Sequence, residues 1–132
     1  MEQRILKKIL VVDDEPLVLR LTKRILEQHG YEVLIATSGE EALRLCEQHR
    51  DTIDLVVSDV RMPKMSGIEL AGCISGLPHP IPVILMSGFP QSSTPVEELS
   101  FPGARHFLTK PFSAPELVET ISAALAERSN PG

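Results

Sequence analysis

Residues 53–59 read IDLVVSD, and this stretch decides the fold class. An almost unbroken apolar run is typical of a parallel β-strand that is buried on both faces. Here the run ends directly on a carboxylate, Asp59. Two further apolar runs also end on polar side chains: ILVV (9–12) is followed by Asp13 and Asp14, and IPVILM (81–86) by Ser87. The three runs together predict an α/β protein built on a parallel sheet.

Short β-branched runs alternate along the chain with segments whose apolar residues recur every three or four positions. The expected strands are Ile9–Val12, Tyr31–Ala36, Ile53–Ser58, Ile81–Met86 and Arg105–Thr109. The expected apolar helix faces are Leu17/Leu21/Ile25, Ala42/Leu45/Cys46, Leu70/Cys73/Ile74/Leu77 and Leu117/Ile121/Ala124/Leu125. This alternation implies right-handed crossovers and an open parallel sheet with helices on both faces.

Helix ends are marked in the sequence. Ser38, Ser66 and Ser113 are each followed by Glu three positions later, which predicts a capping box at the start of three helices. Gly30 lies where the first helix should stop. The proline-rich stretch between Gly88 and Gly103 leaves space for a fourth helix that is short or irregular, with Thr94 as its cap.

Composition places the chain among single globular domains. Its 132 residues, 42% hydrophobic and 23% charged, predict one domain over residues 1–132 with its core at about 8–125. The net charge of −5 argues against binding nucleic acid through bulk electrostatics. Because the sequence shows neither a membrane span nor a signal peptide, we expect a cytoplasmic protein. Cys46 and Cys73 fall on apolar helix faces and are expected to be buried packing residues.

Polar side chains follow four of the expected strands at the point where each strand ends. They are Asp13, Asp14, Asp59, Ser87 and Lys110. Ligands of open α/β sheets bind beyond the carboxyl ends of the strands, so we expect these side chains to share one site. Two carboxylates about 4 Å apart repel by roughly 4 kcal/mol at an effective dielectric constant of 20. Three carboxylates therefore need a proton, Lys110 or a bound cation, and oxygen ligands of this kind suit Mg²⁺.

Such a site has the parts for phosphoryl transfer. A divalent cation would screen a carboxylate and neutralise charge on the transferring oxygens. Ser87 and Lys110 are each suited to hold one phosphoryl oxygen. One aspartate is then left as the nucleophile, and carboxylates do form acyl phosphates.

Each of these residues has an ordinary reading when it is taken alone. Asp13-Asp14 before Glu15-Pro16 is compatible with a turn and helix cap, and Asp59 with a loop residue. Ser87-Gly88 is a common turn pair. The prediction of a site depends on their coincidence at successive strand ends.

Four motifs resemble the receiver domain of two-component response regulators over about residues 8–125. They are ILVVDDEP (9–16), DLVVSDVRMPKMSGIEL (54–70), VILMSG (83–88) and FLTKPF (107–112). The resemblance implies a flavodoxin-like, doubly wound five-stranded parallel sheet in the order 2-1-3-4-5. It also implies a domain that takes a phosphoryl group from a phosphohistidine donor in a Mg²⁺-dependent reaction, after which the acyl phosphate switches its conformation. Such a domain catalyses its own phosphorylation and dephosphorylation and turns over no external substrate.

The resemblance gives roles to individual residues. Asp59 matches the phosphoacceptor, and Ser87 and Lys110 match the hydroxyl and the lysine that bind the phosphoryl group. Ser87 and Phe107 match the switch pair, and Phe107 has no hydroxyl, so any switching there would depend on packing alone. The bond before Pro111 is cis in the family.

The metal site that the resemblance implies is made of oxygen ligands. Asp14 matches a direct Mg²⁺ ligand and Asp13 one that acts mainly through water. Asp59 and the backbone carbonyl of Arg61 match the other protein ligands.

The implied partner is a sensor histidine kinase or a histidine-phosphotransfer domain that docks near the first helix and the loops around Asp59. We expect no nucleic acid bound by this domain alone, no membrane, and a monomer or weak dimer. Receivers of hybrid histidine kinases look similar after the MSG motif, so the chain is either a stand-alone receiver or a piece of a longer protein.

The sequence favours this function over two other classes. A phosphohydrolase of the haloacid dehalogenase type needs a D-x-D motif, and the matching stretch here is Asp59-Val60-Arg61, without the second aspartate. A receiver that signals without phosphorylation usually lacks some of the site residues, and this chain has the complete set.

Overall fold

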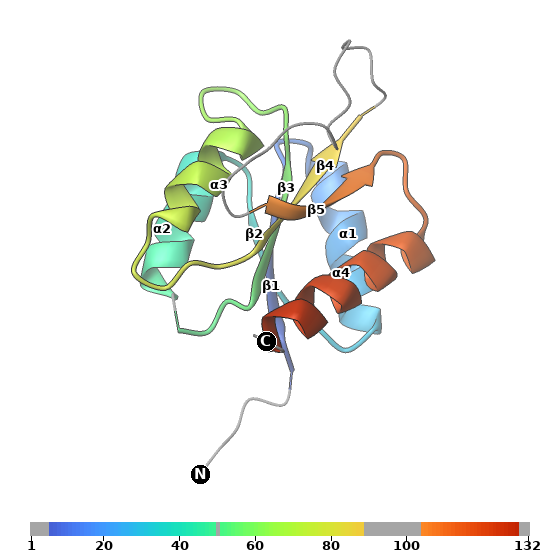
Figure 1. Cartoon of the computed structure of the whole chain (residues 1–132). Coiled ribbons are helices and arrows are strands. Elements are labelled where there is room, and N and C mark those ends of the chain that lie inside the picture. Colours follow the sequence, from blue (N-terminus) through green and yellow to red (C-terminus); the bar gives the residue numbers. More distant parts are fainter. Residues whose placement is uncertain (1–5, 50, 89–103, 130–132) are drawn as a thin grey trace.

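The computed structural model describes residues 6–49, 51–88 and 104–129. Five parallel strands in this part form one sheet in the order β2-β1-β3-β4-β5 (Figure 1). The strands are β1 (Lys8–Val12), β2 (Glu32–Ala36), β3 (Leu55–Asp59), β4 (Val83–Ser87) and β5 (Ala104–Thr109). The flavodoxin-like, doubly wound sheet and its strand order are therefore confirmed.

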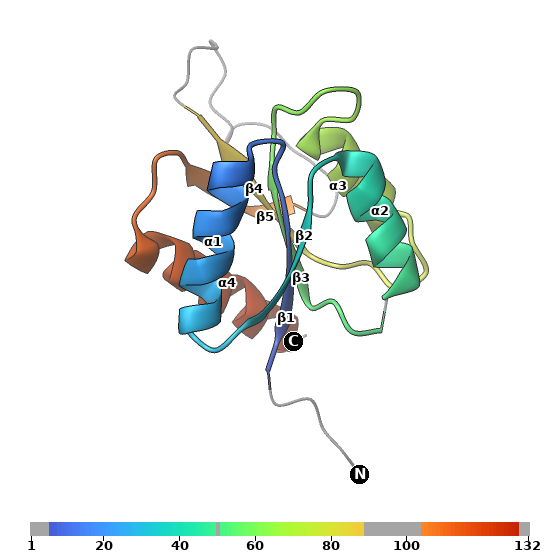
Figure 2. The ribbon, with the colours of Figure 1, turned by 180° about the vertical axis from the view of Figure 1, so that it is seen from behind.

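Helices cover both faces of the sheet. The described helices are α1 (Pro16–Gln28), α2 (Gly39–Gln48), α3 (Gly67–Ser75) and α4 (Ala114–Ser129). Helices α1 and α4 lie on one face and α2 and α3 on the other, as the two opposite views show (Figures 1 and 2). The short fourth helix predicted from the proline-rich stretch falls on residues 89–103, outside the described residues. The label α4 therefore denotes the helix predicted from the apolar face that begins at Leu117. Across the described ranges, no helix is long and apolar enough to cross a membrane.

The core consists of two apolar layers, one on each side of the sheet. Successive strand side chains point to opposite faces, so one strand serves both layers. In β1, Ile9 and Val11 pack with α1 and α4, whereas Leu10 and Val12 pack with α2 and α3. All four side chains are completely buried. This burial explains why the strand sequences are apolar at consecutive positions.

The predicted strand bounds are displaced by one or two residues in places. Ile53 and Asp54 precede β3, and Ile81 precedes β4, although all three are buried. Apolar residues mark where the chain is buried, and the chain is already buried before its backbone pairs with the neighbouring strands. The Asp54 carboxylate accepts the backbone N–H of Lys8 at 2.8 Å, which ties the approach to β3 to the start of β1.

Two of the three predicted capping boxes are complete, at Ser66 and Ser113. The third is only half formed. The Ser38 hydroxyl accepts the backbone N–H of Glu41 at 3.1 Å, but the Glu41 carboxylate accepts the N–H of Thr37 at 2.8 Å instead of that of Ser38. Gly30 follows α1 with φ 89°, a conformation that glycine adopts without steric cost.

The apolar face predicted for α1 is wrong for Leu17 and Leu21, whereas Ile25 is partly buried and packs against the core. Leu17 and Leu21 are 61% and 53% exposed, whereas Leu19, Thr22 and Leu26 are buried. Leucines occur on both sides of this helix, so the 3.6-residue period alone does not decide which side faces the sheet. Two leucines are left on the surface.

The two cysteines differ. Cys46 is buried as expected, and burial raises the pKa of its thiol to about 12, so the thiol stays protonated at neutral pH. Cys73 is exposed, so the expectation of a buried packing residue is wrong there. The buried face of the short helix α3 is formed by Leu70, Ala71 and Ile74, and Cys73 lies outside it.

The packing of α1 gives a direct test of which face is buried. We expect Leu26→Ala to lower the free energy of unfolding by about 2–5 kcal/mol, because it removes a fully buried side chain and leaves a cavity. Leu21→Ala on the same helix should change it by no more than about 0.5 kcal/mol. Urea denaturation of the two variants measures both values, and a larger loss for Leu21→Ala would contradict this packing.

Candidate functional site

The predicted site residues come together at one edge of the sheet. Asp13 follows β1, Asp59 ends β3, Ser87 ends β4 and Lys110 follows β5. The strands are parallel, so their carboxyl ends share this edge, at the top in Figure 1 and away from the N-terminus. The strand order therefore assembles the site from segments that are far apart in the sequence.

Three carboxylates form the centre of the site. Oxygen atoms of Asp13, Asp14 and Asp59 lie within 4.8 Å of one another. Asp13 is completely buried, Asp59 is 8% exposed and Asp14 is exposed. Negative charges this close and this poorly solvated repel strongly, so the cluster needs a positive charge beside it.

Lys110 supplies one such charge. Its Nζ donates a hydrogen bond to Oδ2 of Asp13 at 2.8 Å and lies 3.5 Å from Oδ1 of Asp59. Its backbone N–H donates to the carbonyl of Ser87 at 2.7 Å, and the Lys110–Pro111 peptide bond is cis. Main chain and side chain thus both hold the ammonium between two carboxylates.

Asp13 has a second contact. Its Oδ1 accepts the backbone N–H of Glu15 at 3.0 Å, at the start of α1. The turn reading of the Asp13-Asp14 pair is therefore correct for Asp13 and is compatible with the site reading. The cap reading is wrong, because the N-cap of α1 is Glu15 and no side chain caps this helix. One oxygen of this carboxylate fixes the turn and the other binds Lys110.

Burial and charge shift two pKa values in the site. Burial raises the pKa of Asp59 above its ordinary value; Lys110 opposes the shift, and the charges of Asp13 and Asp14 add to it. Burial by itself would lower the pKa of Lys110, but the hydrogen bond to Asp13 and the charge of Asp59 outweigh it, and the pKa is raised. Lys110 therefore stays charged at neutral pH, and ionised Asp59 is costly for the fold.

The backbone after Asp59 is held tightly. Val60 donates its N–H to the carbonyl of Met86 at 2.9 Å and accepts the N–H of Gly67 at 2.9 Å. A Cβ at Gly67 would overlap the carbonyl oxygen of Asp59, so only glycine lets the two segments approach this closely. The side chain of Arg61, which follows Val60, is exposed.

Ser87 and Phe107 belong to the last two strands of the sheet. Ser87 is partly buried, and its hydroxyl donates to the carbonyl of Gly88 at 3.3 Å. Phe107 is partly buried against the core layer under α2 and α3. Both residues predicted as the switch pair are thus on the two strands, β4 and β5, that end at the site.

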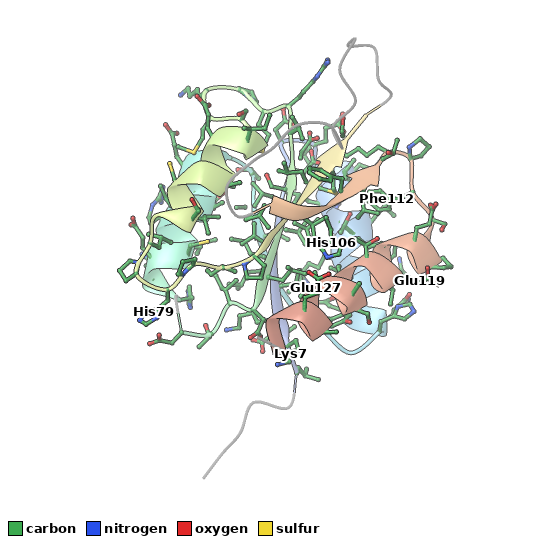
Figure 3. The ribbon with its side chains drawn as sticks, in the orientation of Figure 1. Lys7, His79, His106, Phe112, Glu119 and Glu127 are labelled. Carbon is green, nitrogen blue, oxygen red and sulfur yellow. The ribbon has the colours of Figure 1, made fainter. Side chains whose placement is uncertain are left out.

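Sequence reasoning missed a groove next to the site. It has a volume of about 420 Å³, and Val18, Leu21, Ile25, Pro111 and Phe112 line it together with Lys110. Phe112 lies in the connection between β5 and α4 (Figure 3). Helix α1 forms one wall of the groove, and the exposed lining residue Leu21 was expected to lie in the core. The apolar residues of FLTKPF next to Lys110 were the available signal.

The donor set fits a magnesium ion. The cluster offers carboxylate oxygens from Asp13, Asp14 and Asp59, and one of the three carboxylates is exposed. Mg²⁺ typically takes one or two carboxylates and keeps several waters. Lys110 balances only one of the three negative charges, so a divalent cation would complete the neutralisation.

A doubly wound parallel sheet that gathers an acidic cluster and a lysine at its carboxyl edge defines a flavodoxin-like domain with its site at the ends of the strands. The profile of the response regulator receiver domain matches residues 9–122, and the chain belongs to this family. Members of the family are signalling domains of two-component systems and are not enzymes that turn over a substrate.

The relatives agree with this assignment. The chain is 38% identical over 119 residues to the alkaline phosphatase synthesis transcriptional regulatory protein PhoP of Bacillus subtilis. The matched region covers 90% of this chain and 48% of PhoP. It is 32% identical over 124 residues to the polar-differentiation response regulator DivK of Brucella anthropi, with 92% of this chain and 98% of DivK covered. The chain thus spans about half the length of the first relative and nearly all of the second.

Solved structures agree as well. A CheY-like receiver domain protein from Methanospirillum hungatei superposes with a TM-score of 0.84 at 34% identity, covering 96% of this chain and 99% of that one. The receiver domain of the hybrid histidine kinase CckA gives a TM-score of 0.74 at 36% identity, covering 89% and 98%. The chain is similar both to a CheY-like receiver and to one from a hybrid kinase.

The raised pKa of Asp59 predicts how stability depends on pH. The folded state holds this proton more tightly than the unfolded state, so stability falls as the pH rises from about 4 through the raised pKa. In Mg²⁺-free buffer at pH 7, Asp59→Asn should therefore raise the free energy of unfolding and the Tm. The gain should disappear below pH 4. Thermal denaturation between pH 3 and 8 measures it, and a variant less stable than wild type at pH 7 would contradict it.

Proposed function

We propose that Asp59 accepts a phosphoryl group from a phosphohistidine donor in a Mg²⁺-dependent reaction. The observation that carries the proposal is the position of Lys110, whose Nζ lies 2.8 Å from Asp13 and 3.5 Å from Asp59. A fixed ammonium next to a buried carboxylate is the electrostatic environment that an incoming phosphoryl group needs. Membership of the receiver family supports the same role.

In the proposed reaction, an oxygen of the Asp59 carboxylate attacks phosphorus. The new O–P bond forms as the P–N bond to the donor imidazole breaks, and the imidazole leaves with that electron pair. The Lys110 ammonium moves from the Asp59 carboxylate to a phosphoryl oxygen and neutralises part of the charge on that oxygen. The Ser87 hydroxyl, at the end of the neighbouring strand, donates to another phosphoryl oxygen.

The carboxylates of Asp13, Asp14 and Asp59 and the backbone carbonyl of Arg61 would hold the metal. When bound, Mg²⁺ supplies positive charge that screens the carboxylates from the phosphoryl oxygens. Asp13 has a fixed position in the site, because its Oδ1 accepts the backbone N–H of Glu15.

The acyl phosphate is proposed to switch the domain through Ser87 and Phe107. Drawing the Ser87 hydroxyl towards the phosphoryl group would release its contact with Gly88 and open space beside Phe107. Because Phe107 has no hydroxyl, its movement would be driven by packing against the core layer under α2 and α3.

Intact mass spectrometry after incubation with Mg²⁺ and acetyl phosphate tests the acceptor. We expect one phosphoryl group on the wild type, lost with hydroxylamine and absent with a chelator, and none on Asp59→Asn. Asp51→Asn is a matched control, because Asp51 is an exposed aspartate between α2 and β3. An adduct on Asp59→Asn, or no adduct on the wild type with either a small donor or a phosphohistidine protein, would contradict the proposal.

The groove beside Lys110 is the proposed docking surface for the donor. Leu17 and Leu21 are exposed on α1, and Leu21 lines the groove that ends at Lys110. Apolar side chains at this spacing suit a helix laid into the groove. A helix seated there would present its phosphohistidine next to Asp59, because the groove and the site share Lys110. The exposed Arg20 and Arg24 on the same helix favour a donor with acidic side chains.

Replacing one wall of the groove separates docking from chemistry. We expect Leu21→Ala to slow phosphoryl transfer from a phosphorylated histidine-phosphotransfer domain by about tenfold. A tenfold change corresponds to a loss of roughly 1.4 kcal/mol of binding free energy. Its rate with acetyl phosphate should stay unchanged, since a small donor needs no groove. Ile35→Ala, which truncates an exposed apolar residue on β2, is the control and should affect neither rate. Equal slowing with both donors would argue against docking in the groove.

A further inference from the structure

The peptide chain from Asp59 to Arg61 is positioned by contacts outside the acidic cluster. It carries three successive carbonyl groups, and the third, that of Arg61, is the metal ligand of the proposed function. The second, on Val60, accepts the N–H of Gly67 at 2.9 Å. The first, on Asp59, accepts the hydroxyl of Ser58 at 3.0 Å. Two donors thus set the path of the chain immediately before the expected ligand.

Ser58 stands out among the residues of the sheet. It is one of the few buried polar residues among the described ones, and it is completely buried. It lies in the centre of the sheet, paired with Val12 of β1 and Leu85 of β4. An apolar residue would be the ordinary choice at such a position. The hydroxyl instead bonds the carbonyl of the phosphoacceptor itself.

Gly67 approaches the same carbonyl closely. A Cβ on Gly67 would overlap the Asp59 oxygen and would lie 3.1 Å from Oγ of Ser58. The Asp59 carbonyl oxygen therefore has both the Ser58 hydroxyl and the backbone at the start of α3 as close neighbours. These contacts restrict rotation of the Asp59–Val60 peptide, and the Gly67 N–H, 2.9 Å from the Val60 carbonyl oxygen, holds the peptide that follows.

We propose that Ser58 is a positioning residue that, together with the close approach of Gly67, orients the Asp59–Arg61 backbone so that the Arg61 carbonyl faces the metal. This inference rests on the proposed function and adds a residue to it. Ser58 contacts neither metal nor phosphoryl group in this account. It acts through the carbonyl of Asp59.

The test compares Ser58→Ala with Val57→Ala. Val57 is the neighbouring residue in β3, is also completely buried and faces the opposite core layer, so its truncation measures general loosening of the strand. Calorimetric titration with Mg²⁺ alone gives the metal affinity, and phosphorylation by acetyl phosphate over a range of Mg²⁺ concentrations gives the half-saturating concentration and the limiting rate. Thermal denaturation reports the stability of each variant.

For Ser58→Ala we expect Mg²⁺ affinity to fall about three- to tenfold, the loss typical of one hydrogen bond. The half-saturating Mg²⁺ concentration should rise by the same factor, while the limiting rate at saturating Mg²⁺ stays near that of the wild type. Val57→Ala should lower Tm at least as much and leave Mg²⁺ affinity unchanged.

An unchanged affinity in Ser58→Ala, or an equal loss in Val57→Ala, would overturn the positioning role while leaving the proposed function intact. A wild-type protein that binds no Mg²⁺ and takes no phosphoryl group would overturn both.

Discussion

The contact of Lys110 with Asp13 and Asp59 is the interaction on which the rest of the site depends. It crosses the sheet, from the end of β5 to the ends of β1 and β3. Without it, the buried carboxylates of Asp13 and Asp59 would lose the ion pairs with Lys110 that balance part of their charge. With it, the cluster is tolerated but keeps an excess of negative charge. A divalent cation would neutralise that excess, and the chemistry we propose requires such a cation.

The parallel sheet makes this arrangement possible. Two apolar layers bury both faces, so the central strands are fixed and their carboxyl ends can project charged groups at one edge. The backbone beyond β3 needs its own constraints, and these come from Gly67 and Ser58. The groove along α1 borders the same edge, so one corner of the molecule combines charge, a fixed backbone and an apolar surface.

Much of this could be read from the sequence, because burial and strand ends leave clear patterns. The runs before Asp13, Asp59 and Ser87 predicted both the sheet and its site. The exposure of Leu21 could not be predicted, since α1 carries leucines on two sides and only tertiary packing chooses between them. The contact from Ser58 also left no signal, because a serine within a strand is equally compatible with a plain structural position.

The dependence of stability on Mg²⁺ tests the central claim most directly, namely that the strand ends assemble an unbalanced acidic cluster. Thermal denaturation of wild type and Asp13→Asn over increasing Mg²⁺ concentration separates metal binding from catalysis. We expect the wild type to gain about 2.7 kcal/mol of stability at a Mg²⁺ concentration a hundred times the dissociation constant, and Asp13→Asn to gain much less at the same concentrations. An equal response of the two proteins, or no response of the wild type, would contradict it.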